Sequence, residues 1–136
     1  MRLSDSVIPF FSIMNVAYHE ALPDSYLLIL APGRENETAP ETALAHWLRH
    51  ARHCDKPAVW VDCGMLHSLS GEAAGLLRAA HWQLLAAQRQ LVLVHVPERV
   101  KHALLQRGPE LAPCILPTLL DAARQAAARP VLAGAA

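Results

Sequence analysis

The sequence predicts one α/β domain: a mixed β-sheet with an N-terminal hairpin, central parallel strands and about four helices mainly on one face. The chain has 136 residues, of which 53% are hydrophobic and 18% charged, so it can bury a core of its own. Two apolar runs come first, and short apolar runs then alternate with helix-like spacing. That alternation is typical of parallel strands joined by crossover helices. We expect an N-terminal segment at residues 1–10, the domain at 11–129 and a tail at 130–136.

The first elements form a hairpin and a helix. Residues 11–19 and 26–30 are rich in aromatic and branched apolar side chains, and the four residues from Leu22 to Ser25 between them have turn chemistry. Thr38 then stands three residues before Glu41, which is a capping-box pattern, with Pro40 in the first turn. We therefore expect a helix over about residues 39–53.

The later elements alternate. Residues 58–63 and 91–96 are short apolar runs and predict two buried central strands. Between them, residues 71–88 have helical apolar spacing. The remaining predicted elements are a helix that starts at Pro97 and stops at Gly108, a short edge strand at 114–116 and a final helix at 118–129.

Composition excludes several classes of function. Twelve basic and twelve acidic residues give a formal net charge of zero, whereas domains that grip nucleic acid usually carry an excess of Lys and Arg. No apolar run reaches the ~18 residues that a membrane span needs, so we expect no direct membrane insertion. Cys54, Cys63 and Cys114 form no C-x-x-C pair, which fits a reducing compartment. We expect a cytoplasmic protein.

Two stretches resemble a known family. Val59-Trp60-Val61-Asp62 is followed by a loop, a helix start rich in small residues and Gly75-Leu76-Leu77. The run from Leu91 to Val96 leads into Pro97-Glu98-Arg99-Val100 and then Leu104-Leu105-Gln106-Arg107-Gly108. In this order the segments resemble the STAS domain (sulfate transporter and anti-sigma factor antagonist), in its single-domain bacterial type, over about residues 11–126.

The resemblance implies a non-enzymatic interaction module without a cofactor. Its partner would be an anti-sigma factor or a related serine kinase, which in this family phosphorylates a serine in an Asp-Ser-Ser-Gly-like motif at the start of the helix after the central strand. An ungapped alignment places Ser70 at the motif's Asp and Glu72 at the usual acceptor. A two-residue deletion instead aligns Ser68-Leu69-Ser70-Gly71 with the motif and keeps Ser70 as the acceptor. We favour the ungapped alignment, in which Glu72 replaces the usual acceptor; Ser70 and Ser68 are the candidate phospho-acceptors in the alternative.

The start of this helix matters in either alignment. A helix N-terminus carries unpaired N–H groups and a partial positive charge, so a negative group is stabilised there. In the simplest interpretation, Ser70 is the N-cap of this helix and Glu72 lies in its first turn, so that both residues only stabilise the start of the helix. The alternative is that Glu72 keeps this surface in a permanently phosphate-like state, or removes regulation.

We expect a partner to dock on this region, because small residues let a partner's backbone come close. The expected partner-binding residues are Ser70, Glu72, Ala73, Gly75 and Arg78, with Asn36 and Thr38 on the preceding loop as a second edge. The resemblance also permits a soluble subunit that binds the nucleotide-binding subunit of a lipid-transport ABC complex. A homodimer is a further expectation left open.

Histidines on the first helix suggest a different class of function. His46, His50 and His53 share one face at i, i+4 and i+7 spacing, which suits a small-ligand or metal site. That face lies opposite the apolar side of the helix, so a solvated, mildly basic surface is the favoured interpretation. We expect no bound metal.

A cysteine nucleophile is the remaining catalytic pattern. Asp62, Cys63 and His67 lie close in sequence, and a thiolate beside a histidine is a usual activated pair. Cys63 ends a strand expected to be buried, however, so we expect inert packing. His95, inside the 91–96 run, is expected to be a sheet histidine, and His81 and Trp82 to lie in the core or an interface.

Overall fold

The computed structural model describes residues 14–32, 40–106, 108 and 112–128. Its sheet has five strands in the spatial order β1-β2-β3-β4-β5. β1 and β2 are antiparallel, and each later pair is parallel. The strands are β1 (Met14–Ala21), β2 (Ser25–Pro32), β3 (Ala58–Asp62), β4 (Gln90–Val94) and β5 (Cys114–Leu116).

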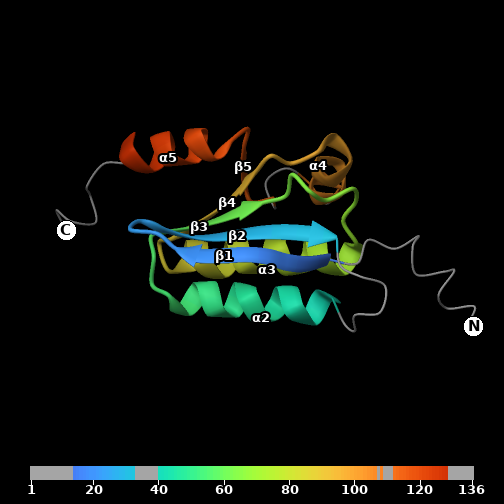
Figure 1. Ribbon diagram of the computed structural model, residues 1–136, viewed down its shortest axis with the longest axis horizontal. Coiled ribbons are helices and arrows are strands. Elements are labelled where there is room, and N and C mark those ends of the chain that lie inside the picture. Colours follow the sequence, from blue (N-terminus) through green and yellow to red (C-terminus); the bar gives the residue numbers. More distant parts are fainter. Residues whose placement is uncertain (1–13, 33–39, 107, 109–111, 129–136) are drawn as a thin grey trace, which may run out of the picture.

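Helices cover both faces of the sheet unequally. They are α2 (Pro40–His53), α3 (Gly71–Ala86), α4 (Glu98–Leu105) and α5 (Leu119–Ala128). α2 and α3 lie side by side on one face, and α5 lies on the other (Figure 1). α4 packs against α3, and its buried side chains Val100 and Leu104 join the same core. The predicted α/β class, with the hairpin and with helices mainly on one face, is confirmed.

The main core lies between the sheet and α2, α3 and α4. Strand side chains alternate between the two faces, so every second residue of β2, β3 and β4 enters this core. Residues at less than 1% exposure include Leu28, Val61, Leu77 and Leu93. Each fully buried side chain of this size contributes about 1.5–3 kcal/mol through the hydrophobic effect.

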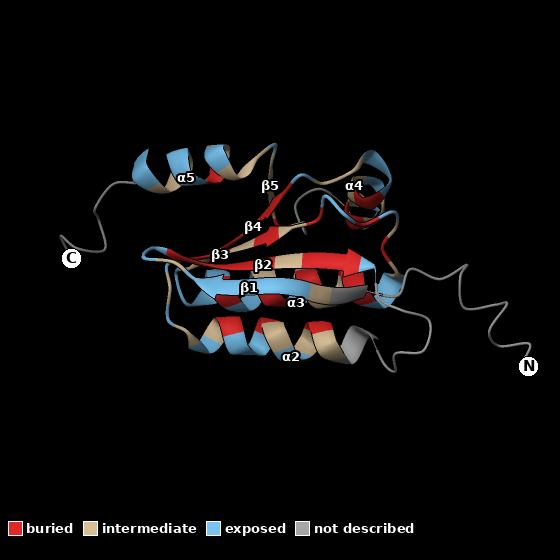
Figure 2. Cartoon of the chain, viewed as in Figure 1, coloured by how far each residue is buried: buried red, intermediate tan, exposed pale blue. Residues whose placement is uncertain are grey.

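A smaller core forms on the opposite face. Val92 and Val94 of β4 pack there with Ala122 of α5, and Trp60 and Leu119 lie against them. Most of the remaining surface of α5 is exposed (Figure 2). The second face is therefore thinly covered.

The predicted boundaries hold to within a few residues. β1 runs past its predicted end at residue 19, and β2 extends beyond its predicted run at both ends. Ala17 sits at an irregularity in their register. The predicted segments 1–10 and 130–136, and the capping residue Thr38, lie outside the described residues. No helix in the described part of the chain has the length and apolar character needed to cross a membrane.

Candidate functional site

Parallel pairing brings the candidate residues to one edge of the sheet. β3 and β4 end side by side, with Asp62 paired to Val94 across the strands. The loop 63–70 leaves β3 at this edge and leads into α3, while the chain after β4 leads into α4. Loops at the carboxyl ends of parallel strands are a frequent location of binding sites in α/β proteins.

Asp62 organises this edge. Its Oδ1 accepts a hydrogen bond from the backbone N–H of Gly64 at 2.8 Å, and its Oδ2 lies 3.1 Å from Nδ1 of His95. His95 follows the end of β4 rather than lying inside it and has a φ of 53°, so its prediction as a sheet histidine was wrong. The strand stops early because this left-handed backbone cannot continue the ladder.

Gly64 lies where the two loops approach each other closely. A Cβ at this position would lie 3.1 Å from Cβ of His95 and 3.2 Å from Oδ1 of Asp62. Both distances are tighter than ordinary contacts. The glycine therefore permits the Asp62–His95 pair to form.

Cys63 is placed for packing rather than for nucleophilic chemistry. Its side chain is fully buried in the main core, and its N–H donates to the carbonyl of Val94 at 3.0 Å. Burial, and to a smaller extent the Asp62 charge, raises the pKa of the Cys63 thiol to about 12. The thiolate that a nucleophile needs is therefore absent near neutral pH. Asp62 pairs with His95, and His67 is exposed.

Two buried leucines hold the loop 63–70 on the protein. Leu66 and Leu69 are 3% and 8% exposed, and the N–H of Leu66 donates to the carbonyl of Cys63 at 3.0 Å. Between them, His67 is exposed and Ser68 is half-buried. Met65 is 54% exposed. The loop thus presents its polar and sulfur-bearing side chains from a fixed base.

The predicted helix cap is confirmed. Oγ of Ser70 accepts a hydrogen bond from the N–H of Ala73 at 3.0 Å, and the carbonyl of Ser70 accepts from the N–H of Ala74. Glu72 is exposed in the first turn, where its charge is favoured by the helix dipole. Ser70 is half-buried and Glu72 is exposed. The first turn of α3 therefore combines a capped backbone with one exposed carboxylate.

The other predicted contact residues differ in accessibility. Ala73 is 1% exposed and packs in the main core, so its methyl group is not offered to a partner. Gly75 and Arg78 are half-buried. Asn36 and Thr38 lie outside the described residues.

An apolar surface on α3 shares Gly75 with the predicted site and extends beyond it to the second half of the helix. Opposite its buried side, the helix carries small residues in its first half and the large, half-exposed Trp82 and Leu85 in its second half. We call this surface the outer face of α3; its small and apolar residues are Gly71, Gly75, Ala79, Trp82, Leu85 and Ala86, and the polar side chains of Glu72, Arg78 and Gln83 lie on the same side of the helix. The sequence could have indicated this surface, because residues 71–86 place apolar side chains on nearly all sides of the helix. Such a helix is usually covered by other parts of the structure on every side. Trp82 was expected in the core or an interface, and 46% of it remains exposed.

The histidine face of α2 is exposed, as predicted. His46, His50 and His53 all reach solvent. Trp47, between them, packs against His19 of β1 with ring centroids 3.9 Å apart and the ring planes tilted by 32°, and His50 meets the ring of Tyr26 edge-on. Among the described residues, no group of three or more His, Cys, Asp or Glu side chains is arranged to hold a metal ion.

Comparison with known proteins supports the fold. No protein-family model and no curated protein matches the sequence. Three similar solved structures are anti-sigma factor antagonists of Thermotoga maritima and Mycobacterium paratuberculosis and a serine-to-glutamate variant of RsbS from Moorella thermoacetica. Their TM-scores are 0.67, 0.62 and 0.62, at 14%, 18% and 11% sequence identity. The alignments cover 80%, 83% and 79% of this chain and 92%, 93% and 94% of those chains. The chain therefore has the STAS fold that these anti-sigma factor antagonists share.

Proposed function

We propose that this protein is a cytoplasmic, non-enzymatic STAS-type regulatory module that docks a protein partner through the first turn and the outer face of α3. The observation that carries the proposal is the apolar outer face itself. A surface helix of a free-standing domain normally turns charged and polar residues to water. Here Trp82 and Leu85 remain about half exposed on that side, at 46% and 47%.

The glycines of α3 support close approach of a partner. A Cβ added at Gly71 or Gly75 would meet no atom within 4 Å, so the fold itself does not require glycine at either position. Glycine inside a helix nevertheless costs about 0.5–1 kcal/mol relative to alanine. A partner whose backbone lies on this half of the helix would account for that cost.

The charge at the helix start is the second part of the proposal. The resemblance to anti-sigma factor antagonists makes an anti-sigma factor or a related serine kinase the expected partner. Glu72 is exposed beside the capped N-terminus, and we propose that the partner reads its charge. Phosphorylation of Ser70 or Ser68 would add about 1.5–2 negative charges at the same place, more than one carboxylate supplies. The phosphate would also meet repulsion from Glu72.

The test is an affinity pull-down from the native cell, with bound proteins quantified by mass spectrometry. The baits are the wild type, Glu72→Lys and Trp82→Ala, with Glu98→Lys as matched control. Glu98 is also an exposed acidic residue in the first turn of a helix, α4, so its variant changes charge equally without touching α3.

We expect wild type and Glu98→Lys to recover one kinase-like or other regulatory partner equally. Glu72→Lys and Trp82→Ala should each reduce recovery at least about tenfold, as removal of a central interface residue does. Equal recovery with all four baits would contradict docking on α3. Intact-mass measurement after incubation with the recovered kinase separates a phosphorylated Ser68 or Ser70 from a site held permanently by Glu72.

A further inference from the structure

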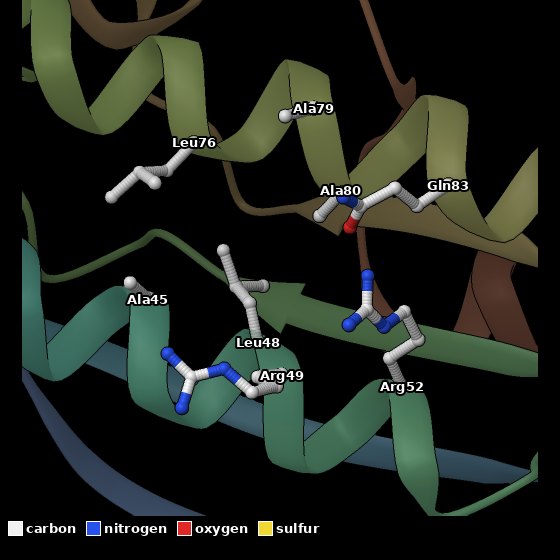
Figure 3. Close-up of a pocket in the computed structure, with 8 residues that line it drawn as sticks. All are labelled: Ala45, Leu48, Arg49, Arg52, Leu76, Ala79, Ala80 and Gln83. Atoms are coloured by element: carbon white, nitrogen blue, oxygen red, sulfur yellow. The ribbon is translucent and has the colours of Figure 1, made fainter.

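A groove lies between α2 and α3 and is lined by residues of both helices. It has a volume of about 180 Å³ and opens to solvent (Figure 3). Five of its lining residues are aliphatic and form the floor and walls: Ala45, Leu48, Leu76, Ala79 and Ala80. The other three are Arg49, Arg52 and Gln83, so the lining, within the residues that the structure describes, contains two cations and no carboxylate.

The two guanidinium groups have no neutralising carboxylate in the part of the chain that the structure describes. Arg49 and Arg52 lie on the α2 side, and Arg52 extends toward α3, on the side where Ala80 and Gln83 lie (Figure 3). Among the described residues, neither side chain forms a hydrogen bond or ion pair. Both belong to the C-terminal half of α2, where the helix dipole favours a cation. The dipole explains the two charges, but it does not explain the apolar groove beside them.

Apolar walls with cations at the rim fit one class of ligand. We propose that this groove binds a small amphipathic anion, an alkyl chain of about eight carbons that ends in a carboxylate or a phosphate monoester. The chain would lie against Leu48 and Leu76, while the anionic head pairs with Arg49 and Arg52. Guanidinium binds both heads through paired N–H donors, and the amide of Gln83 adds a further polar contact.

The size and openness of the groove set the expected affinity. Sites for drug-sized ligands have volumes of about 300–1,000 Å³, so this groove admits a shorter molecule. Because one side stays open, only part of the chain is removed from water. We expect a dissociation constant on the order of 1 mM for an eight-carbon carboxylate. The proposal does not rest on the proposed docking function.

The test is a titration of the full chain with sodium octanoate, followed by methyl and amide NMR. We expect saturable shifts at Leu48, Leu76 and Ala79, and at the side-chain amide of Gln83. Octyl phosphate, in a second arm, shows whether the phosphate head is accepted as well as the carboxylate. Octylamine has the same chain with the opposite charge and should bind at least about tenfold more weakly, since it meets two cations.

Variants that remove a positive charge show where the anionic head binds. Arg49→Gln combined with Arg52→Gln should weaken octanoate binding at least about tenfold, whereas Arg124→Gln, on exposed α5 across the sheet, should leave it unchanged. Unchanged amide spectra away from the groove verify that the double variant is folded. Equal binding of octylamine and octanoate, unchanged binding by the double variant, or shifts absent from the groove would each overturn the proposal.

Discussion

Ser70 is the residue at which the loop 63–70 becomes a helix, because its hydroxyl replaces the carbonyl that the Ala73 N–H lacks. Ser70→Ala removes that acceptor and should lower the free energy of unfolding by about 1 kcal/mol. Ser70→Asp keeps an acceptor oxygen and adds a charge that the dipole favours, so its stability should stay close to wild type. Urea unfolding followed by tryptophan fluorescence measures both. An Asp variant as unstable as the Ala variant would show that the cap does not stabilise α3.

Two glycines near the site should respond in opposite directions to the same methyl group. Gly64→Ala brings a Cβ to 3.1 Å from that of His95 and should destabilise the protein, because the His95 and Asp62 side chains must give way slightly and their pairing is disturbed. Gly75→Ala meets open space inside a helix and should raise the free energy of unfolding by about 0.5–1 kcal/mol. Differential scanning calorimetry of the pair tests this contrast. If Gly75→Ala is stabilising and still binds the partner less well, the glycine serves contact rather than folding.

At the scale of elements, the C-terminus of α3 has a Schellman arrangement with a residue ill-suited to it. The N–H of Arg89 donates to the carbonyl of Leu84 and that of Gln88 to the carbonyl of Leu85, which places Gln88 at a φ of 62°. Gln88→Gly should therefore raise the free energy of unfolding, by about 1 kcal/mol. Ala86→Gly, two residues earlier in right-handed helix, is the matched control and should lower it by about 1 kcal/mol. Chemical denaturation distinguishes them, and a loss of stability in both would contradict the expected relief of strain.

The elements differ in how well the sequence predicts them. The buried strands β3 and β4 were predictable because each is a short apolar run rich in branched residues, with Pro57 before β3 and Pro97 after β4. The end of β4 was not, because it depends on His95 turning toward Asp62, 33 positions earlier. The C-terminal end of α2 is likewise fixed from a distance. Nε of Arg89 donates to the carbonyl of Lys56 at 2.6 Å, and its Nη1 to that of Arg52 at 2.5 Å.

For the candidate site, local chemistry was predictable and accessibility was not. A serine followed by small residues and a glutamate indicated the cap at Ser70 and the charge at Glu72 without knowledge of the fold. Whether Ala73 faces the core and Trp82 faces water depends on which side of α3 meets the sheet and α2. The rotation of α3 about its own axis is difficult to predict from the sequence, because apolar residues lie on nearly all sides of the helix.

At the scale of the whole molecule, two neutral buried groups should limit stability at opposite ends of the pH range. His81 is half-buried, its Nδ1 is buried with no hydrogen-bond partner among the described residues, and burial lowers the pKa of this imidazole from 6.5. Burial raises the pKa of Cys63 from 9.0 to about 12. In each case the fold favours the neutral form, whereas the unfolded chain ionises at the ordinary pKa. Unfolding should therefore take up a proton at His81 in acid and release one from Cys63 in alkali.

Free energies of unfolding from urea titrations between pH 5 and pH 10 test this whole-molecule expectation. Stability should fall below pH 6.5, as unfolded His81 becomes protonated, and should fall again above pH 9, by at most about 1.4 kcal/mol per pH unit from Cys63. Tyr26, whose pKa burial also raises, adds to the alkaline loss. His81→Leu should flatten the acid limb only, and Cys63→Ala should flatten part of the alkaline limb only, whatever constant cost its small cavity adds. If the loss of stability in acid is the same in His81→Leu as in the wild type, the group that titrates there is not His81. If the loss in alkali is the same in Cys63→Ala as in the wild type, the thiol ionises in the folded protein as readily as in the unfolded chain.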